Sequence, residues 1–210
     1  MTKIYDISQT LRPALPVWPG DTPFDIETTW QMDENCPVLV SKLTLSTHSG
    51  THADAPSHYD PHGIDSARVN LTPYVGLCQV ITVPNASGPV QVSDIFPHLQ
   101  EIPERLLIRT FERFPHESWP NGFRAVDAAL IDELAKGGCL LIGTDTPSLD
   151  PESSKTLDAH NAVKKAGMAI LEGLVLDGVP DGTYELIALP LKIAGADASP
   201  VRAILRSMDA

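Results

Sequence analysis

Residues 47–58 read THSGTHADAPSH, and three of the chain's seven histidines, His48, His52 and His58, lie in this stretch together with Asp54. All four positions are even, so a straight strand would place their side chains on one face. Such a strand would hold residues 48 and 52 roughly 13 Å apart. Two imidazoles that bind one metal ion instead bring their nitrogens within about 3–4 Å of each other. A shared metal therefore requires a sharp bend, which Gly50 permits.

The segments on either side agree with a bend. Val38–Leu45 alternates in the manner of a strand, with Leu39, Leu43 and Leu45 on one face. A helix is disfavoured because Gly50 lowers helix propensity and Pro56 pushes the residue before it out of the helical region. We therefore expect a strand followed by a bent loop whose side chains converge on one point.

Two histidines and one aspartate are too few for a closed structural zinc site. They fit an open catalytic site, or half of a binuclear one. His160, in LDAHNAVKKAG, and Glu172, in the apolar run AILEGL, are candidates to complete it. A carboxylate in such a run is costly unless it is paired or bound to a cation. The alternative is that Glu172 points to solvent from a half-buried strand, and the residues alone favour neither reading.

The remaining histidines carry less signal. His62 is expected on a surface loop, and His98 and His116 lie next to prolines without other metal-binding residues nearby. Asp145, in IGTDTPS, follows a predicted strand, and we expect it to cap a turn rather than to act in chemistry.

Composition narrows the classes of function. The 210 residues carry a net charge of −12, which disfavours nucleic acid and anionic membranes as partners. The three cysteines are far apart, so we expect buried free thiols rather than disulfides. No signal peptide or membrane-length apolar run is recognisable, and a cytoplasmic location is expected.

Predicted elements indicate one α/β domain over residues 1–210, with a curved mixed sheet and few short helices. Helices are expected at Val126–Ala135, with Asp127 as its cap, and at Leu157–Ala166, with a weaker one at Ser93–Leu99 that contains Pro97. Strands are expected at Lys3–Ile7, Val38–Leu45, Leu77–Val83, Arg105–Arg109, Cys139–Ile142, Ala169–Leu176, Tyr184–Ile193 and Val201–Arg206.

The stretch HSGTHADAPSH resembles the H-x-G-T-H-x-D-x-P-x-H signature of the cyclase-like metal hydrolases. Within that superfamily the chain resembles the bacterial kynurenine formamidase (arylformamidase) family nearly from end to end. The Trp-Pro-Gly-Asp sequence and the compact length favour this branch over longer relatives such as isatin hydrolases. The matching segments are IYDISQTLRPALPVWPGDTPF, HSGTHADAPSH, IGTDTPS at 142–148, DAHNAVKKAGMAILEGL at 158–174 and GADASPVRAIL.

This resemblance implies a swivelling β/α/β-type fold, a homodimer and two Zn²⁺ ions per subunit, although manganese and cobalt accept similar ligands. The implied activity is hydrolysis of N-formyl-L-kynurenine to L-kynurenine and formate by a water activated at the two metals. Ligands of the first metal would be His48, His52 and Asp54, and ligands of the second Asp54, His160 and Glu172, with both carboxylates bridging.

The resemblance also implies roles for two further residues. His58 would be the general acid/base, although it could instead be a further metal ligand. Trp18 would contact the aromatic ring of the substrate, whereas the commoner fate of a tryptophan is a place in the hydrophobic core.

Three rival interpretations remain open from the sequence. An iron oxygenase with two histidines and one carboxylate would use Asp54 but leave His160 and Glu172 without a role. A binding protein or a structural metal site is the second, although structural zinc sites usually draw on cysteine. The third keeps the fold and metals and acts on another amide, a lactam or an isatin-like cyclic imide.

Overall fold

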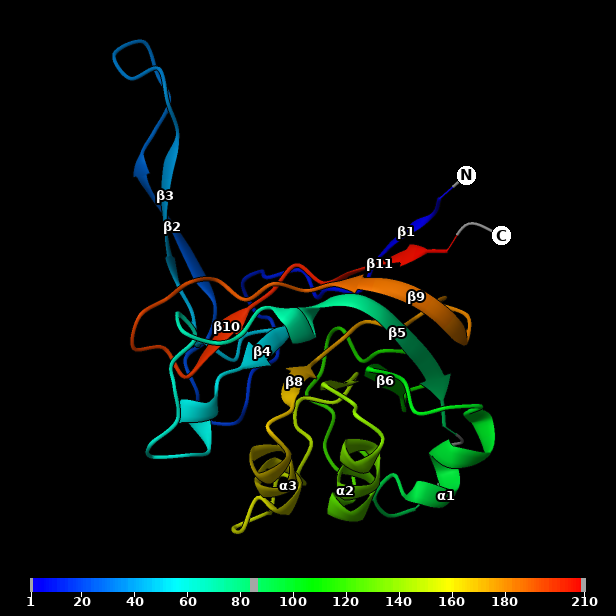
Figure 1. Ribbon diagram of the computed structural model, residues 1–210. Helices are drawn as coiled ribbons and strands as arrows, with labels where there is room; N and C mark the ends of the chain where they lie inside the picture. Colours follow the sequence, from blue (N-terminus) through cyan, green and yellow to red (C-terminus); the bar gives the residue numbers. More distant parts are fainter. Residues whose placement is uncertain (1, 84–86, 209–210) are drawn as a thin grey trace.

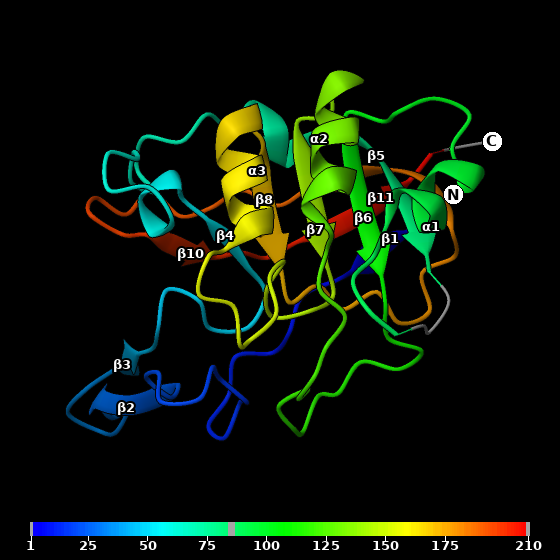
Figure 2. The same cartoon turned by 90° about the horizontal axis from the view of Figure 1, so that it is seen from below.

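The computed structural model describes residues 2–83 and 87–208. At its centre are four parallel strands, which pair in chain order and are connected through three short helices. The strands are β5 (Val75–Thr82), β6 (Arg105–Arg109), β7 (Leu141–Thr144) and β8 (Ala169–Glu172). The helices are α1 (Val92–Ile95), α2 (Ala128–Lys136) and α3 (Asp158–Ala166). Figure 2 shows the three helices on the same face of the sheet.

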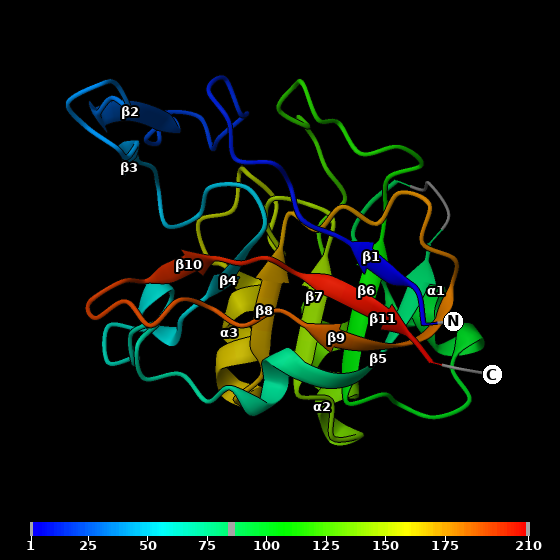
Figure 3. The same cartoon turned by 90° about the horizontal axis from the view of Figure 1, so that it is seen from above.

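Antiparallel strands extend the sheet on both sides of this centre. The full order is β1-β11-β9-β5-β6-β7-β8-β4-β10, and the sheet curves strongly across it (Figures 1 and 3). The added strands are β1 (Ile4–Asp6), β11 (Ile204–Ser207) and β9 (Gly182–Ile187) beside β5, and β4 (His52–Asp54) and β10 (Ala198–Pro200) beside β8. The predicted fold class, α/β with a curved mixed sheet and few short helices, is confirmed.

Strands β6, β7 and β8 are almost entirely buried on both faces, which explains their largely apolar sequences. Leu106 and Ile108 of β6 pack toward the helices, against Leu130 and Leu134 of α2. Leu107, between them, points to the opposite face and joins a second apolar cluster. Each large aliphatic side chain buried in this way stabilises the fold by about 1.5–3 kcal/mol.

The helices follow their sequence signals. The carboxylate of Asp127 accepts a hydrogen bond from the backbone N–H of Ala129 and caps α2, as predicted. Helix α3 begins at Asp158 and ends at Gly167, whose left-handed conformation closes it. Helix α1 is one turn only and continues as a 3₁₀ turn over Phe96–His98, because Pro97 removes a backbone donor there.

The strand predictions are largely confirmed, and the bounds predicted for β6 match the structure at both ends. Three strands were missed. These are β4, β10 and β2 (Asp25–Trp30). Residues 47–58 form a bend as predicted, yet the part expected to be loop contains β4. A three-residue strand is too short to show the alternation by which strands are recognised.

The predicted strand at Val38–Leu45 corresponds to β3 (Val40–Thr44), which pairs only with β2. Together they form a hairpin, here called the arm (residues 25–44), that projects away from the rest of the molecule (Figure 1). Every residue of β2 and β3 is exposed. The alternation in β3 is therefore not explained by packing against the protein's own core.

Two further predictions concern the whole chain. Cys78 and Cys139 are buried free thiols, as expected, while Cys36 is only half-buried. Within residues 2–83 and 87–208, the structure contains no helix with the length and apolar character that a membrane crossing requires.

Candidate metal centre and active site

The predicted site residues meet at the carboxyl ends of the parallel strands, where open α/β sheets usually bind ligands. Glu172 is the last residue of β8. Strand β4 runs antiparallel beside it and places His52 directly opposite Glu172, so both side chains lie on one face. His160 reaches the same point from the first turn of α3.

Two glycines permit this approach. Gly50 has a φ of +66°, and a Cβ there would lie 2.8 Å from the side chain of Leu11. Gly173 has a φ of +64°, and a Cβ there would lie 2.7 Å from the carbonyl oxygen of Gly50. The predicted bend at Gly50 is therefore present, and a second glycine lets it pack against the end of β8.

Asp54 lies at the centre of the cluster. Both carboxylate oxygens are buried, and neither has a hydrogen-bond partner within the described part of the chain. Nδ1 of His48 lies 3.2 Å from Oδ1, and Nε2 of His160 lies 3.4 Å from Oδ2. Nε2 of His52 lies 3.5 Å from Oδ1. A buried carboxylate without donors is unstable unless a cation compensates it.

The rings of His52 and His160 are oriented by hydrogen bonds on their far sides. Nδ1 of His52 donates to the carbonyl of Gly50 at 2.9 Å. Nδ1 of His160 donates to Oδ2 of Asp150 at 2.6 Å. In the neutral form of each ring, this bond leaves Nε2 free and directed at the carboxylates, as is usual for histidines that bind metals.

Glu172 is equally well fixed. Its Oε1 accepts a hydrogen bond from the backbone N–H of Leu149 at 2.8 Å. Oε2 lies 3.4 Å from Nε2 of His52, and Oε1 lies 3.6 Å from Nε2 of His160. The residue is 2% exposed, which excludes the alternative that it faces solvent.

These separations allow a test of the fit to a metal. Ligand atoms on a tetrahedral ion with bonds near 2.0–2.2 Å lie roughly 3.3–3.6 Å apart. The contacts of Asp54 and Glu172 with the three imidazoles span 3.2–3.6 Å. Imidazole nitrogens and carboxylates are also the donors that zinc and related divalent ions prefer. The cluster therefore fits a divalent metal cofactor.

A second group of side chains borders the cluster on its open side. Nε2 of His48 lies 3.2 Å from Oδ2 of Asp197, and Nδ1 of His58 lies 3.4 Å from the same oxygen. His58 ends a 3₁₀ turn that begins at Pro56. Asp54, His58 and His160 also offer donor atoms within 4.8 Å of one another. Both roles considered for His58 thus agree with its position.

The charges of the cluster are strongly coupled. Burial alone would lower the pKa of His48, but Asp54 and Asp197 raise it to about 9. Burial acts likewise on His160, whose pKa Asp150 and Asp54 raise to about 10. Burial would raise the pKa of Asp54, yet the imidazoles around it hold it well below its usual value. The carboxylates thus draw positive charge into the site, either protons or a metal ion.

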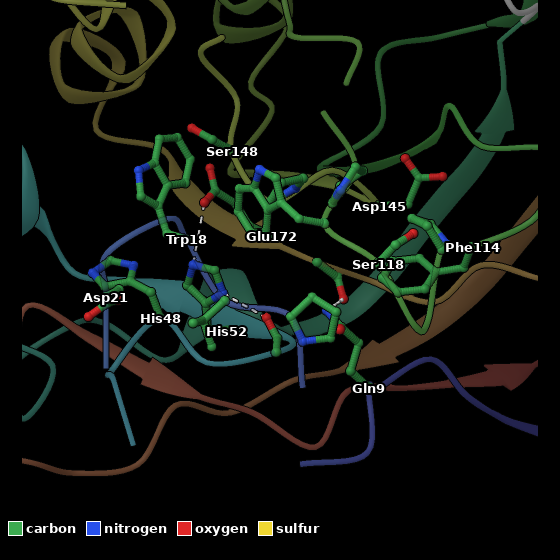
Figure 4. A pocket seen from close by; sticks show the side chains of 18 of the residues that line it. Gln9, Trp18, Asp21, His48, His52, Phe114, Ser118, Asp145, Ser148 and Glu172 are labelled. Carbon is green, nitrogen blue, oxygen red and sulfur yellow. Dashed lines mark hydrogen bonds and ion pairs between the residues drawn. The ribbon is translucent and has the colours of Figure 1, made fainter. Parts of the chain in front are cut away.

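A cavity of about 340 Å³ opens above the cluster. Trp18, Phe114 and Trp119 contribute to its aromatic wall, and Figure 4 shows the first two around the same pocket as His48 and His52. The rings of Trp18 and Trp119 meet edge to face, with centroids 5.4 Å apart. Trp18 is half-buried and lines the cavity, so it is not a core residue.

Of the residues expected to be uninvolved, the three histidines lie where predicted. His62, His98 and His116 are exposed. The carboxylate of Asp145 accepts hydrogen bonds from the hydroxyl and N–H of Thr110 and from the N–H of Phe111. It therefore ties the end of β7 to the segment after β6 rather than capping a turn, and Asp145 also borders the cavity above the cluster.

Sequence reasoning missed Asp150, Asp197, Phe114 and Trp119. Asp150 had a recognisable signal, since it precedes a predicted helix and its carboxylate accepts hydrogen bonds from the N–H groups of Ala159 and His160. Asp197 lies in the GADASP stretch, but nothing in that stretch indicates which residues it meets.

Comparison with known proteins agrees with this geometry. Residues 5–151 match the family model described as "Cyclase: Putative cyclase". A protein named kynurenine formamidase from Maricaulis maris is 57% identical over 99% of this chain and 100% of its own length. Another of that name, from Erythrobacter litoralis, is 53% identical over 98% of this chain and 94% of its own length.

Solved structures resemble the fold over its full length. One described as a potential metal-dependent hydrolase with cyclase activity is 25% identical, with a TM-score of 0.85 and coverage of 100% of both chains. Isatin hydrolase A from Labrenzia aggregata is 25% identical, with a TM-score of 0.84 and coverage of 99% of this chain and 94% of its own.

Fold and site together define the class, and the chain belongs to the cyclase family. Within this family it groups with the kynurenine formamidases, which confirms the resemblance inferred from the sequence.

Proposed function

We propose that this protein hydrolyses N-formyl-L-kynurenine to L-kynurenine and formate. The observation that carries the proposal is the buried Asp54 carboxylate. It has no hydrogen-bond donor among the described residues and is surrounded by imidazoles at the base of an aromatic-walled cavity. Relatives named kynurenine formamidase, 53–57% identical over nearly the whole chain, support the choice of substrate.

Two Zn²⁺ ions per subunit are part of the proposal. His48, His52 and Asp54 would hold the first, and Asp54, His160 and Glu172 the second, with the two carboxylates bridging. Bound there, the ions would lower the pKa of a water molecule and polarise the formyl oxygen.

The chain's own residues account for binding and proton transfer. Trp18 and Trp119 border the aromatic end of the cavity and would hold the anthraniloyl ring of the substrate. The water oxygen bonds to the formyl carbon and passes one proton to His58. The carbon–nitrogen bond then breaks, and the formyl carbon is released as formic acid, which ionises to formate. The aromatic amine leaves poorly as an anion, so His58 gives its proton to the leaving nitrogen.

The decisive experiment is an assay of zinc-loaded protein with N-formyl-L-kynurenine, in which formate and kynurenine should appear in equal amounts. Chelation should abolish turnover and added zinc restore it. Metal analysis of the same sample should give two zinc ions per chain, whereas one iron per chain would favour an oxygenase. Absence of turnover in the fully loaded protein would contradict the proposal.

A second candidate is hydrolysis of a cyclic amide such as isatin. The likeness to isatin hydrolase A favours it, at 25% identity and a TM-score of 0.84. Isatin belongs in the same assay, and a higher kcat/KM for isatin than for the formamide would select this second activity.

The homodimer implied by the family is also a proposal, and the arm supports it. An isolated two-stranded hairpin is marginally stable in water, yet the arm exposes large apolar side chains. Its exposed residues include Ile26, Trp30, Met32, Leu39 and Leu43, between 48% and 57% exposed. A second copy of the chain would cover them. Light scattering should give twice the mass of one chain, and the Leu39→Glu, Leu43→Glu double variant should be monomeric.

A further inference from the structure

Asp197 joins the two histidines on the open side of the site. Its Oδ2 lies 3.2 Å from Nε2 of His48 and 3.4 Å from Nδ1 of His58. Among the described residues, it is the only hydrogen-bonding partner found for the His58 ring. The His58 side chain is 34% exposed, and its ring also packs against that of His48, with the two ring centroids 4.2 Å apart.

Asp197 itself is firmly held. Its Oδ1 accepts a hydrogen bond from the hydroxyl of Thr47 at 2.7 Å. Its carbonyl accepts one from the N–H of Ala55 at 2.8 Å, and the next residue, Ala198, pairs with Asp54 in the sheet. The carboxylate therefore approaches both rings from a fixed frame.

We infer that Asp197 is a positioning residue that orients the imidazole of His58 for proton transfer to the leaving nitrogen. The inference rests on the proposed function for the nature of the leaving group. It extends that function, because neither the signature nor the family match gave Asp197 a role.

The hydrogen-bond geometry supplies the mechanism. An ionised carboxylate only accepts hydrogen bonds, so Nδ1 of His58 must be the protonated nitrogen that donates to Asp197. The other nitrogen, Nε2, is then the one that exchanges a proton with the substrate. A carboxylate behind one ring nitrogen, with the reacting group at the other, is the arrangement found at other catalytic histidines.

The same oxygen accepts the N–H of His48, which leaves Nδ1 of that ring for the metal. One carboxylate therefore fixes the tautomers of a metal ligand and of the proton donor. A side chain that only filled space could not fix these tautomers. Asparagine has nearly the same size as aspartate but lacks its charge, so an Asp197→Asn variant separates a role in orienting the rings from a role in packing.

The test is a double-mutant cycle on zinc-loaded protein with formanilide and 4-nitroformanilide, whose amine leaves more easily. We expect Asp197→Asn to lower kcat for formanilide roughly 100-fold, which is within the range of general acid catalysis. For 4-nitroformanilide the same change should lower kcat less than about fivefold, because its leaving amine needs less help from a proton donor. In a His58→Ala background the same change should lower kcat far less, because only the contact of Asp197 with His48 would then be affected. An equal loss in both backgrounds would overturn the inference, as would loss of bound zinc.

Asp65→Asn is the matched control. Asp65 accepts a hydrogen bond from the N–H of Gly195 at 2.9 Å and so steadies the same loop, but the structure gives it no contact with either histidine. It should leave kcat for both substrates within about twofold, since surface changes away from the site have small effects. A loss matching that of Asp197→Asn would mean that loop order alone explains the result.

A second readout does not depend on turnover. Nitrogen-15 NMR of the zinc-loaded protein should show His58 with its proton on Nδ1, and Asp197→Asn should remove that preference. If the protein hydrolyses neither formamide, the proposed function fails while this measurement still decides the positioning role. An unchanged tautomer in the Asp197→Asn variant would overturn it.

Discussion

The inner and outer halves of the site are built differently. The inner half, which comprises His52, Asp54, His160 and Glu172, lies on two strands and a helix and is at most 3% exposed. The outer half, which comprises His48, His58 and Asp197, lies on loops and has side chains 19%, 34% and 45% exposed.

The difference matches two chemical demands. Metal ligands must keep their positions, which rigid elements with their own supporting hydrogen bonds provide. A group that exchanges protons with solvent and substrate must remain accessible to both. We therefore expect changes to the inner half, and to the proposed ligand His48, to act through metal content. Changes to His58 and Asp197 should instead act through turnover in a protein that keeps its metal.

The strongest test of this distinction is Asp54→Asn. Asp54 faces three imidazoles, and its replacement should remove both metals and lower kcat by roughly 10⁴-fold or more, as when one member of an interdependent catalytic set is lost. Metal analysis and circular dichroism should find an empty but folded protein. Retention of two zinc ions would refute the central place given to Asp54.

His58→Ala tests the outer half. We expect kcat to fall by about 10²–10⁴-fold, the contribution typical of a general acid, while bound zinc stays at the level of the unaltered protein. Zinc content and kcat should be measured on the same preparation. Loss of one zinc ion from the variant would show that His58 is a metal ligand. His58 would then belong with the metal-binding residues rather than with the outer half.

Asp150→Asn examines the support behind the inner half. The variant keeps the size of the side chain but weakens the 2.6 Å hydrogen bond to His160. Zinc affinity should fall by about 10–100-fold, as for other residues that orient metal-binding histidines. Competition with a chelator measures this directly. Asp158→Asn, an exposed acid in the same first turn of α3, is the control and should bind zinc normally.

The smallest expected effect is that of Trp18→Ala, which changes the cavity wall and neither half of the metal site. KM should rise by about tenfold, equivalent to roughly 1.4 kcal/mol of lost binding energy, with kcat and zinc content nearly unchanged. Steady-state kinetics and thermal melting check this. An unchanged KM would remove Trp18 from the substrate contacts.

Much of this arrangement was predictable because its signals are local. The spacing of His48, His52 and Asp54 around Gly50 indicated a bent metal-binding segment, and Asp127 marked the start of α2. The parallel strands were recognisable because burial on both faces produces continuous apolar runs.

The missed features depend on tertiary contacts. Asp197 meets His48 across 149 positions of chain, and no local pattern carries that information. Strand β2 was missed because it pairs only with β3 in an exposed arm and so lacks the alternation that core packing imposes on a strand.

The pairing of His52 with Glu172 across β4 and β8 has a consequence for biogenesis. These two proposed ligands lie far apart in the chain and meet only after the intervening strands and helices have been laid down. The complete site therefore cannot gather before the fold exists, as the ligands of a zinc finger do. Protein made without zinc should consequently be correctly shaped and competent for later loading.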